Sequence, residues 1–543
     1  MKLNLKLPNV FSASVNLFGM LLLGFIVSCD KNSNPIDDSL PNGNAILTIN
    51  VEEIADEQNN DSNASKASTA KTFTGTNQSN SLISSKNMLY QEFDAVVSLR
   101  KDKKQDNRTI ISNNKTAKSS GPELHAAAMT PGIKYRLLLY LNGVFVKSIH
   151  AESGVASHVE VNKDVEYNWY AYSYNTSEDV LDVTNPNAPT IESKIDKPLL
   201  YASGTVMVTG EGIVDKPLRV KFAHRTARIG AELNAKGMFA GIQNIKARFA
   251  NDTYVQTGNL NLLTGNYEGT TSVPVGDLSF SNYSDETKDT IKVAYYYTAA
   301  QDPISPFVVN VESFTLNLDK GDTRTFSTAF QYSMSLDPLN WGYRLTSALD
   351  LIESPVTVAG VKWARANLYF SETDRAYRFR HQIDASYGRS TEEYWNFKAP
   401  FPNGTIGAQD PCTRVYPLNK WRMPNREEIQ SLTNVSSGRT LNADYVEYTA
   451  IGTANPYPSN KLRINKMGYY NIALGIFGIL SDNGVDGYLW SSETGFLGGA
   501  VTGAFGYRVS DNRELGLFGD YVWEHWALSS WGGAENVRCV RND

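Results

Sequence analysis

The chain contains little cysteine and little histidine, and the few that occur are scattered. Three cysteines and six histidines are found in 543 residues, with no CxxC pair and no HxxxH spacing. Structural zinc sites depend on such pairs, so we expect neither a metal nor another cofactor. The net charge of −6, with 20% charged residues, also lacks the basic surplus of a nucleic-acid-binding protein.

Motifs of the common enzyme classes are missing as well. The sequence contains no GxSxG turn for a nucleophilic serine and no phosphate-binding P-loop. Two pairs of adjacent carboxylates occur, Glu392-Glu393 and Glu427-Glu428. Such neighbours diverge by about 100° on a helix and point to opposite faces of a strand, so neither forms an obvious acid–base pair. The sequence therefore predicts a protein without enzymatic activity.

The N-terminal residues have the features of an export signal. Lysines precede an apolar run from Leu17 to Val27, which is too short to span a membrane. An Ile-Val-Ser-Cys sequence ends at Cys29 and resembles the lipobox of bacterial lipoproteins, in which cleavage precedes a lipid-modified cysteine. An ordinary signal peptide with a chance cysteine is the alternative. We expect a signal peptide at 1–28, a lipid anchor at Cys29 and a tether at 29–44, which place the chain on the outer membrane.

The two remaining cysteines frame a region rich in tryptophan. Cys412 and Cys539 lie in residues 341–543, which hold eight of the nine tryptophans. Export to an oxidising compartment permits a disulfide between them. On the chain-entropy model a loop of this length contributes up to ~4–5 kcal/mol. We therefore predict a Cys412–Cys539 disulfide that makes the C-terminal third a separate, rigid module.

The pattern from Ala45 onward is that of β-strands. Apolar and polar side chains alternate over residues 46–51, which gives one apolar face. Asn142-Gly143 between two apolar runs predicts a hairpin, because both residues accept the positive φ of a type I′ turn. Residues 54–86 have no periodicity and predict a loop or a disordered insertion. Short strands between turn signals favour antiparallel sandwiches over a parallel α/β sheet, and we expect no long helix before residue 420.

Residues 45–345 resemble a known family. Tyr201-Ala202, followed by the segment PLRVKFAHRTARI that starts at Pro217, is similar to the fimbrillin (Mfa-like) pilus lipoproteins of Bacteroidetes. The resemblance implies two antiparallel, transthyretin-like β-sandwich domains at 45–198 and 199–345. It also implies partnership with other fimbrillin subunits by strand exchange after proteolysis, because a lost strand bares an apolar groove that another subunit's strand fills. The family's cleavage often follows an arginine, and the first arginine here is Arg100.

Residues 346–543 match a second family at four places in the right order. The matches are G-x-x-W-A-x-x-N-L ending at Leu368, W-R-M-P-x-x-x-E from Trp421, W-S-S-E from Trp490, and V-R-C-V-R ending at Arg541. This order resembles the Fibrobacter-type major paralogous domain, a C-type-lectin-like fold related to the formylglycine-generating enzymes. The resemblance implies an α+β domain with ligand-binding loops. Those enzymes need reactive cysteines, whereas we interpret the pair here as structural.

One helix is expected in this domain. Pro424 suits its first turn, Glu427 and Glu428 favour the N-terminal dipole, and Ile429 and Leu432 form an apolar stripe.

The stretch 494–535 has the composition of a binding surface. Rigid aromatic side chains beside charged ones contribute contact area at low entropy cost. The resemblance adds that some proteins of this fold are diversified by retroelements at positions just before a V-R-C-V-R-like end. For Trp523, His525 and Trp526 a place in the core is an equally open alternative, while Trp490 and Tyr507 are expected in the core. The candidate ligand-binding residues are Arg508, Asp511, Arg513, Tyr521, Trp523, Glu524, His525, Trp526 and Trp531.

The E-P-N, Q-P-D and W-N-D motifs of calcium-dependent lectins do not occur in the sequence, so we expect no calcium-bridged sugar site. The sequence as a whole predicts a mainly β, lipid-anchored surface protein, a pilus tip adhesin whose ligand is a host, bacterial or phage surface group such as a glycan. The alternatives are a structural or anchor pilus subunit, and a surface ligand-binding lipoprotein diversified by a retroelement.

Overall fold

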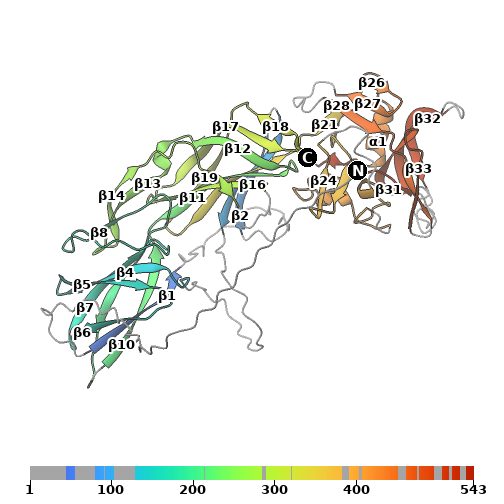
Figure 1. Cartoon of the computed structure of the whole chain (residues 1–543). Helices are drawn as coiled ribbons and strands as arrows, with labels where there is room; N and C mark the ends of the chain where they lie inside the picture. The colour runs from blue at the N-terminus through green and yellow to red at the C-terminus, as the bar shows by residue number, and fades with distance from the viewer. Residues whose placement is uncertain are drawn as a thin grey trace, which may run out of the picture.

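The protein is described by a computed structural model, which is mainly β (Figure 1). Among the described residues no helix is long and apolar enough to cross a bilayer. The expected signal peptide, the lipid anchor Cys29 and the whole tether at 29–44 lie outside them. The described residues are 45–55, 80–90, 92–102, 129–212, 214–283, 289–318, 321–381, 391–402, 406–450, 460–473, 476–494, 504–512, 517–525 and 533–542.

The first unit is a seven-stranded sheet with one apolar core. The side chains of Leu47 and Ile49 are fully buried in that core, so the predicted alternation in the first strand is confirmed. Asn142 and Gly143 have φ values of 51° and 79° in the turn of the predicted hairpin. The strand order is β5 (Val144–Glu152), β4 (Lys134–Leu141), β7 (Glu166–Ser173), β9 (Leu200–Met207), β10 (Val214–His224), β1 (Ala45–Ala55) and β6 (Ser157–Val161).

The second unit is a six-stranded sheet that shares one core with a four-stranded sheet. The six-stranded sheet has the order β15 (Ser281–Asn282), β16 (Ile291–Thr298), β11 (Ala227–Gly237), β20 (Arg344–Ile352), β3 (Asp94–Asp102) and β2 (Asn80–Leu89). The four-stranded sheet contains β12 (Gly241–Phe249), β17 (Ile304–Asn317), β18 (Thr323–Phe326) and β19 (Phe330–Leu336).

A small three-stranded sheet joins the first two units. Leu260 and Leu262 are packed in one buried cluster with Leu138, Tyr140 and Tyr172 of the seven-stranded sheet. This cluster packs the small sheet on the first unit, and the Gln256 amide of β13 donates to Thr298 Oγ1 of β16 in the second unit at 3.0 Å. The small sheet contains β14 (Asn266–Ser272), β13 (Gln256–Asn261) and β8 (Thr190–Glu192), and the one-turn helix η1 (Asp252–Tyr254) precedes β13.

Residues 356–541 form the C-terminal module, which lies at the opposite end of the molecule from the seven-stranded sheet (Figure 1). It contains short sheets around two large apolar clusters and one small one. Its elements are β21 (Val356–Val358), β22 (Val361–Trp363), β23 (Leu368–Ser371), β24 (Ala376–Phe379), η3 (Thr391–Glu393), η4 (Pro411–Arg414), β25 (Trp421–Arg422), α1 (Arg426–Thr433), β26 (Arg439–Leu441), β27 (Tyr445–Thr449), β28 (Lys461–Asn465), β29 (Tyr469–Ala473), β30 (Ile476–Ser481), β31 (Asp486–Thr494), β32 (Ala504–Asn512), β33 (Leu517–His525), β34 (Gly533–Ala534) and β35 (Val540–Arg541).

The predicted helix is α1, and its start differs by two residues from the prediction. Asn425 is the N-cap, and its side chain and that of Glu428 form a reciprocal capping box. Pro424 therefore precedes the cap and does not occupy the first turn. Ile429 and Leu432 are buried, as the apolar stripe predicts.

Two features of the sandwiches differ from the sequence-based expectation. Neither large sheet is purely antiparallel, because β1 pairs with β10 in parallel and β11 pairs with β20 in parallel. The boundary between 198 and 199 also does not separate the sheets: β9 and β10 complete the first, whereas β2 and β3 belong to the second. Residues 80–86 of the expected loop at 54–86 lie in β2. Strand pairing over long sequence separations overrides local composition in each case.

Candidate functional site

Cys412 and Cys539 form the predicted disulfide inside the C-terminal module. Their Cα atoms are 5.8 Å apart across a sequence separation of 127. Cys412 lies in η4, where the Asp410 carboxylate accepts a hydrogen bond from the Cys412 amide at 2.9 Å. Cys539 directly precedes β35, and both cysteines are fully buried. The disulfide thus joins the residue just before β35 to η4 within an apolar core.

Four tryptophans of the module are core residues. Trp363, Trp395, Trp421 and Trp490 are at most 1% exposed, and the Trp490 indole donates a hydrogen bond to the Trp395 carbonyl at 2.7 Å. Tyr507 is also fully buried, so the prediction that Trp490 and Tyr507 lie in the core is confirmed. Much of the tryptophan content of this module is therefore explained by packing.

Arg538 of the V-R-C-V-R sequence holds three segments of the module together. Its guanidinium, which is 1% exposed, donates hydrogen bonds to Asn367 Oδ1 at 2.9 Å, to the Ala364 carbonyl at 3.1 Å and to the Arg463 carbonyl at 2.8 Å. Burial lowers the pKa of this guanidinium. Because its donors are used inside the fold, Arg538 has a structural role, which accounts for its place in the motif.

A three-stranded sheet carries most of the predicted binding stretch. Strands β31, β32 and β33 pair in order and antiparallel, and α1 contacts all three strands. Ile429 of α1 shares a buried cluster with Tyr507 and Val509 of β32, and Val522 of β33 packs against it. The stretch was expected to be loop-like, but residues 504–512 and 517–525 lie in the paired antiparallel strands β32 and β33.

Arg508 is the candidate whose side chain the structure describes. Its Nε and Nη2 atoms donate to Asp486 Oδ2 at 3.0 and 2.5 Å, and its side chain is 13% exposed. Its guanidinium lies 5.3 Å from the centre of the Tyr488 ring, and the Tyr488 hydroxyl donates to Asp482 at 2.8 Å. Arg508 therefore belongs to a buried polar cluster that sequence analysis did not identify.

The other candidates are placed only in part. Tyr521, Trp523 and His525 lie in β33, where they pair with Arg508, Gly506 and Ala504 of β32. Asp511 lies in β32 and Glu524 in β33. The side chains of these five residues, and Arg513, Trp526 and Trp531 entirely, lie outside what the structure describes.

Glu393, in η3, is a buried carboxylate of the same module. Arg380 Nε donates to it at 2.8 Å, and the Glu393 side chain is 3% exposed. Burial raises the pKa of Glu393 to about 7, against the opposing effect of Arg380. Strongly shifted carboxylates mark some active sites. Here the partner is a fixed arginine, so we assign Glu393 to the structural ion pairs of the module.

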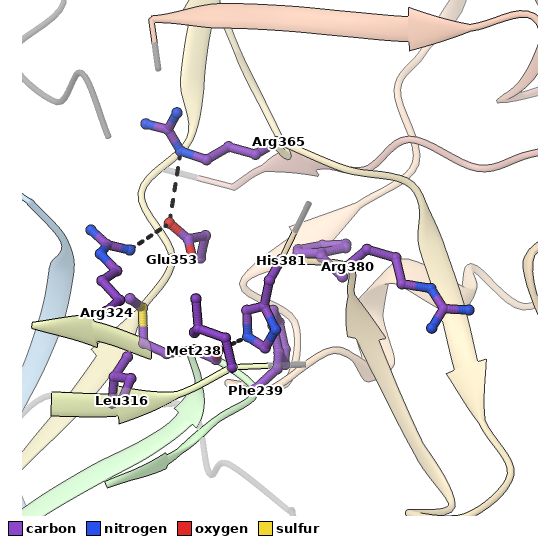
Figure 2. A pocket seen from close by; sticks show the side chains of 10 residues that line it. Met238, Phe239, Leu316, Arg324, Glu353, Arg365, Arg380 and His381 are labelled. Carbon is purple, nitrogen blue, oxygen red and sulfur yellow. Dashed lines mark hydrogen bonds and ion pairs between the residues drawn. The ribbon is translucent and has the colours of Figure 1, made fainter. Parts of the chain in front are cut away.

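A small cavity lies where the module meets the second unit (Figure 2). Figure 2 shows Glu353 between Arg324 and Arg365, and the ion-pair distances are 3.6 and 3.7 Å. The His381 ring lies 2.9 Å from the Met238 carbonyl, measured from Nε2. The cavity measures about 20 Å³, which has room for about one water molecule. Sequence analysis missed this contact, because its partners come from distant parts of the chain.

No protein-family model matches the chain, and no curated protein matches it. Solved structures do match. A candidate cell adhesion protein from Bacteroides fragilis is 13% identical with a TM-score of 0.26, and the match covers 44% of this chain and 87% of that protein. A second, from Bacteroides ovatus, is 15% identical with a TM-score of 0.27, covering 42% and 91%. The fimbrial anchor protein Mfa2 from Porphyromonas gingivalis is 11% identical with a TM-score of 0.20, covering 36% and 73%. At these scores no inference about this chain rests on the likenesses.

Proposed function

We propose that the chain is a lipid-anchored cell-surface adhesin, which stands at the tip of a pilus and binds its ligand through the C-terminal module. The observation that carries this proposal is the position of that module. It lies at the far end of the molecule from the seven-stranded sheet (Figure 1) and is closed by the Cys412–Cys539 disulfide. A terminal globular module leaves one end of the subunit unavailable for strand exchange, which suits a tip.

The proposed binding surface is built on β31, β32 and β33. Strands hold side chains more rigidly than loops do, and rigid aromatic anchors lose little entropy on binding. Since α1 packs against this sheet, the hairpin has a fixed support. The ligand in this proposal is a surface group of a host cell, a bacterium or a phage, with a glycan among the candidates.

Assembly by strand exchange has a physical basis in the position of β1. Strand β1 pairs with β10 on one side and with β6 on the other, and Leu47 and Ile49 fill the core. Removing β1 would bare an apolar groove that a strand from another subunit could fill. Arg100 lies downstream in β3 and is buried in ion pairs, so a cut after Arg100 would also remove β2. The proposal therefore places any processing before β2.

The test is a pair of substitutions in the proposed binding surface. W523A and W526A together should reduce binding to target cells or to a glycan array by about tenfold or more, the loss of one or two hot-spot contacts, while pili still assemble. The matched control is F401A, because Phe401 is an aromatic residue of the same module, 41% exposed and outside 494–535. Its binding should be unchanged.

Persistent binding together with failed assembly in the W523A/W526A variant would favour the alternative, a structural or anchor subunit whose module only caps the fibre. Sibling sequences that differ only within 494–535 would favour diversification by a retroelement. The proposal includes no enzymatic activity. Turnover that survives replacement of Cys412 and Cys539 by serine would require a different account.

A further inference from the structure

Two buried ion pairs join the C-terminal module to the second unit. Asp94, at the start of β3, lies 3.1 Å from the Arg541 guanidinium of β35. Glu353, just after β20, lies 3.7 Å from Arg365 of the module. The side chains in these two pairs are at most 14% exposed. Here the second unit supplies the carboxylates and the module supplies the arginines.

Tyr416 of the module completes a second buried cluster. Its hydroxyl donates to Asp350 Oδ1 of β20 at 2.9 Å and lies 2.9 Å from the Asn234 amide nitrogen of β11, which can donate to it. The other Asp350 oxygen accepts from Arg100 at 2.7 Å, and Arg100 also pairs with Glu232 at 2.5 Å. One side chain of the module thus enters the hydrogen-bond network inside the six-stranded sheet.

Arg541 of β35 makes further contacts with the second unit and the module. Besides the pair with Asp94, it donates to the Glu353 carbonyl, and its guanidinium lies 4.2 Å from the centre of the Trp421 ring. The Arg541 side chain is only 6% exposed. These contacts are kept only while the backbone of β35 is held in place.

The disulfide supplies such a restraint for both docking residues. Tyr416 follows Cys412 by four positions and Arg541 follows Cys539 by two. We propose that the Cys412–Cys539 bond fixes the spacing of Tyr416 and Arg541, so that the two side chains enter the second unit together and the module docks as one rigid body. The disulfide then stabilises the contact between the module and the second unit as well as the core of the module. This inference holds whatever the chain binds.

Breaking the disulfide should weaken the contact between the module and the second unit before it unfolds the module. Trp421 pairs with Arg541 in the β25–β35 ladder, but this ladder is only two residues long on each side. Without the disulfide, β35 is held by fewer restraints, and both docking side chains spend less time in place. Asp350 and Asp94 then lose donors, and the hydrogen bonds of β3 and β20 open more often.

The experiment compares four forms of the full chain, each carrying C29S so that it stays soluble. They are the oxidised parent, C412S/C539S, Y416F/R541Q and the variant with all four substitutions. Amide hydrogen exchange of β3 and β20 is measured for each, and tryptophan fluorescence reports whether the module stays folded. Each double variant should exchange about tenfold faster than the parent, as expected for losing charge-assisted hydrogen bonds. The combined variant should exchange no faster than either double variant.

Additive effects in the combined variant would overturn the inference, because the disulfide and the docking residues would then act independently. Unchanged exchange in C412S/C539S would overturn it as well. If C412S/C539S fails to fold, reduction of the folded parent by dithiothreitol replaces it, with the same outcomes. The matched control is E447Q, which removes ion pairs of Glu447 with Lys461 and Arg463 inside the module and should leave exchange in β3 and β20 unchanged.

Discussion

Replacing Arg100 by methionine should destabilise the second unit severely. Arg100 Nη1 lies 2.5 Å from Glu232 and Arg100 Nη2 lies 2.7 Å from Asp350, and all three side chains are at most 9% exposed. Methionine keeps an apolar stem of similar length but removes the charge. Removing one partner of a buried ion pair typically costs about 3–5 kcal/mol, because the remaining charges stay buried. Here two carboxylates remain, so we expect a loss in this range.

Urea unfolding followed by circular dichroism measures this loss, and its pH dependence tests the cause. Burial raises the pKa of Glu232, and Arg100 opposes the rise. Without Arg100 the folded-state pKa of Glu232 should rise further above its unfolded value. A raised carboxyl pKa means that stability is lost as pH rises and regained as pH falls. The deficit of R100M should therefore be smaller at about pH 5.5 than at about pH 8.

The control for R100M is R219M, which removes an arginine of β10 whose side chain is 70% exposed and lies 3.4 Å from Glu52. A surface pair of this kind contributes at most about 1 kcal/mol. The reasoning is refuted if R100M loses no more stability than R219M, or if its deficit does not shrink on acidification.

Three further predictions concern the C-terminal module. The pKa of Glu393 is raised by burial from 4.5 to about 7, so the free energy of unfolding should fall as pH rises through that interval. In urea titrations E393Q should remove this dependence on pH. An unchanged dependence would mean that Glu393 is not its source. G506A should lower the melting temperature and reduce the stability of the protein by about 1–3 kcal/mol, because a Cβ at this position would lie 2.5 Å from the Leu489 carbonyl oxygen. An unchanged melting temperature would contradict this prediction. N425A should lower the free energy of unfolding by about 1 kcal/mol in chemical denaturation, since the Asn425 side chain accepts a hydrogen bond from the Glu428 amide at 2.8 Å. The control is E427A, at an exposed position of the same helix. An equal loss of stability in both variants would count against the capping role of Asn425.

The sequence predicted those features that depend on neighbouring residues or on restrictive chemistry. Asn142-Gly143 identified a hairpin because few residues accept positive φ, and the disulfide followed from the two cysteines left after the lipobox. The place of β1 beside β10, or of β3 beside β20, had no local signal. Such long-range pairs, parallel for β1 and β10 and antiparallel for β3 and β20, are decided by tertiary packing. For this reason the domain boundary at 198/199 did not match the sheets.

The candidate site was predictable to a lesser degree. Composition singled out residues 494–535, but composition does not distinguish a side chain used inside the fold from one that contacts a ligand. Arg508 illustrates this, because its partner Asp486 is 22 positions away and its pairing arises only once β31 and β32 align. The contacts of Tyr416 and Arg541 were missed for the same reason, since Asp350 and Asp94 lie in a different unit.

Strand β1 belongs to the seven-stranded sheet and β3 to the six-stranded sheet, and this division constrains the order in which the chain folds. Strand β1 needs β10, and β3 needs β20: Arg100 and its partner Asp350 are 250 positions apart. As the chain is synthesised from its N-terminus, these early strands have to wait for late partners. Folds dominated by such non-local pairings form slowly and leave apolar strands open to aggregation meanwhile. Newly made copies should therefore depend on holding chaperones until β20 has emerged.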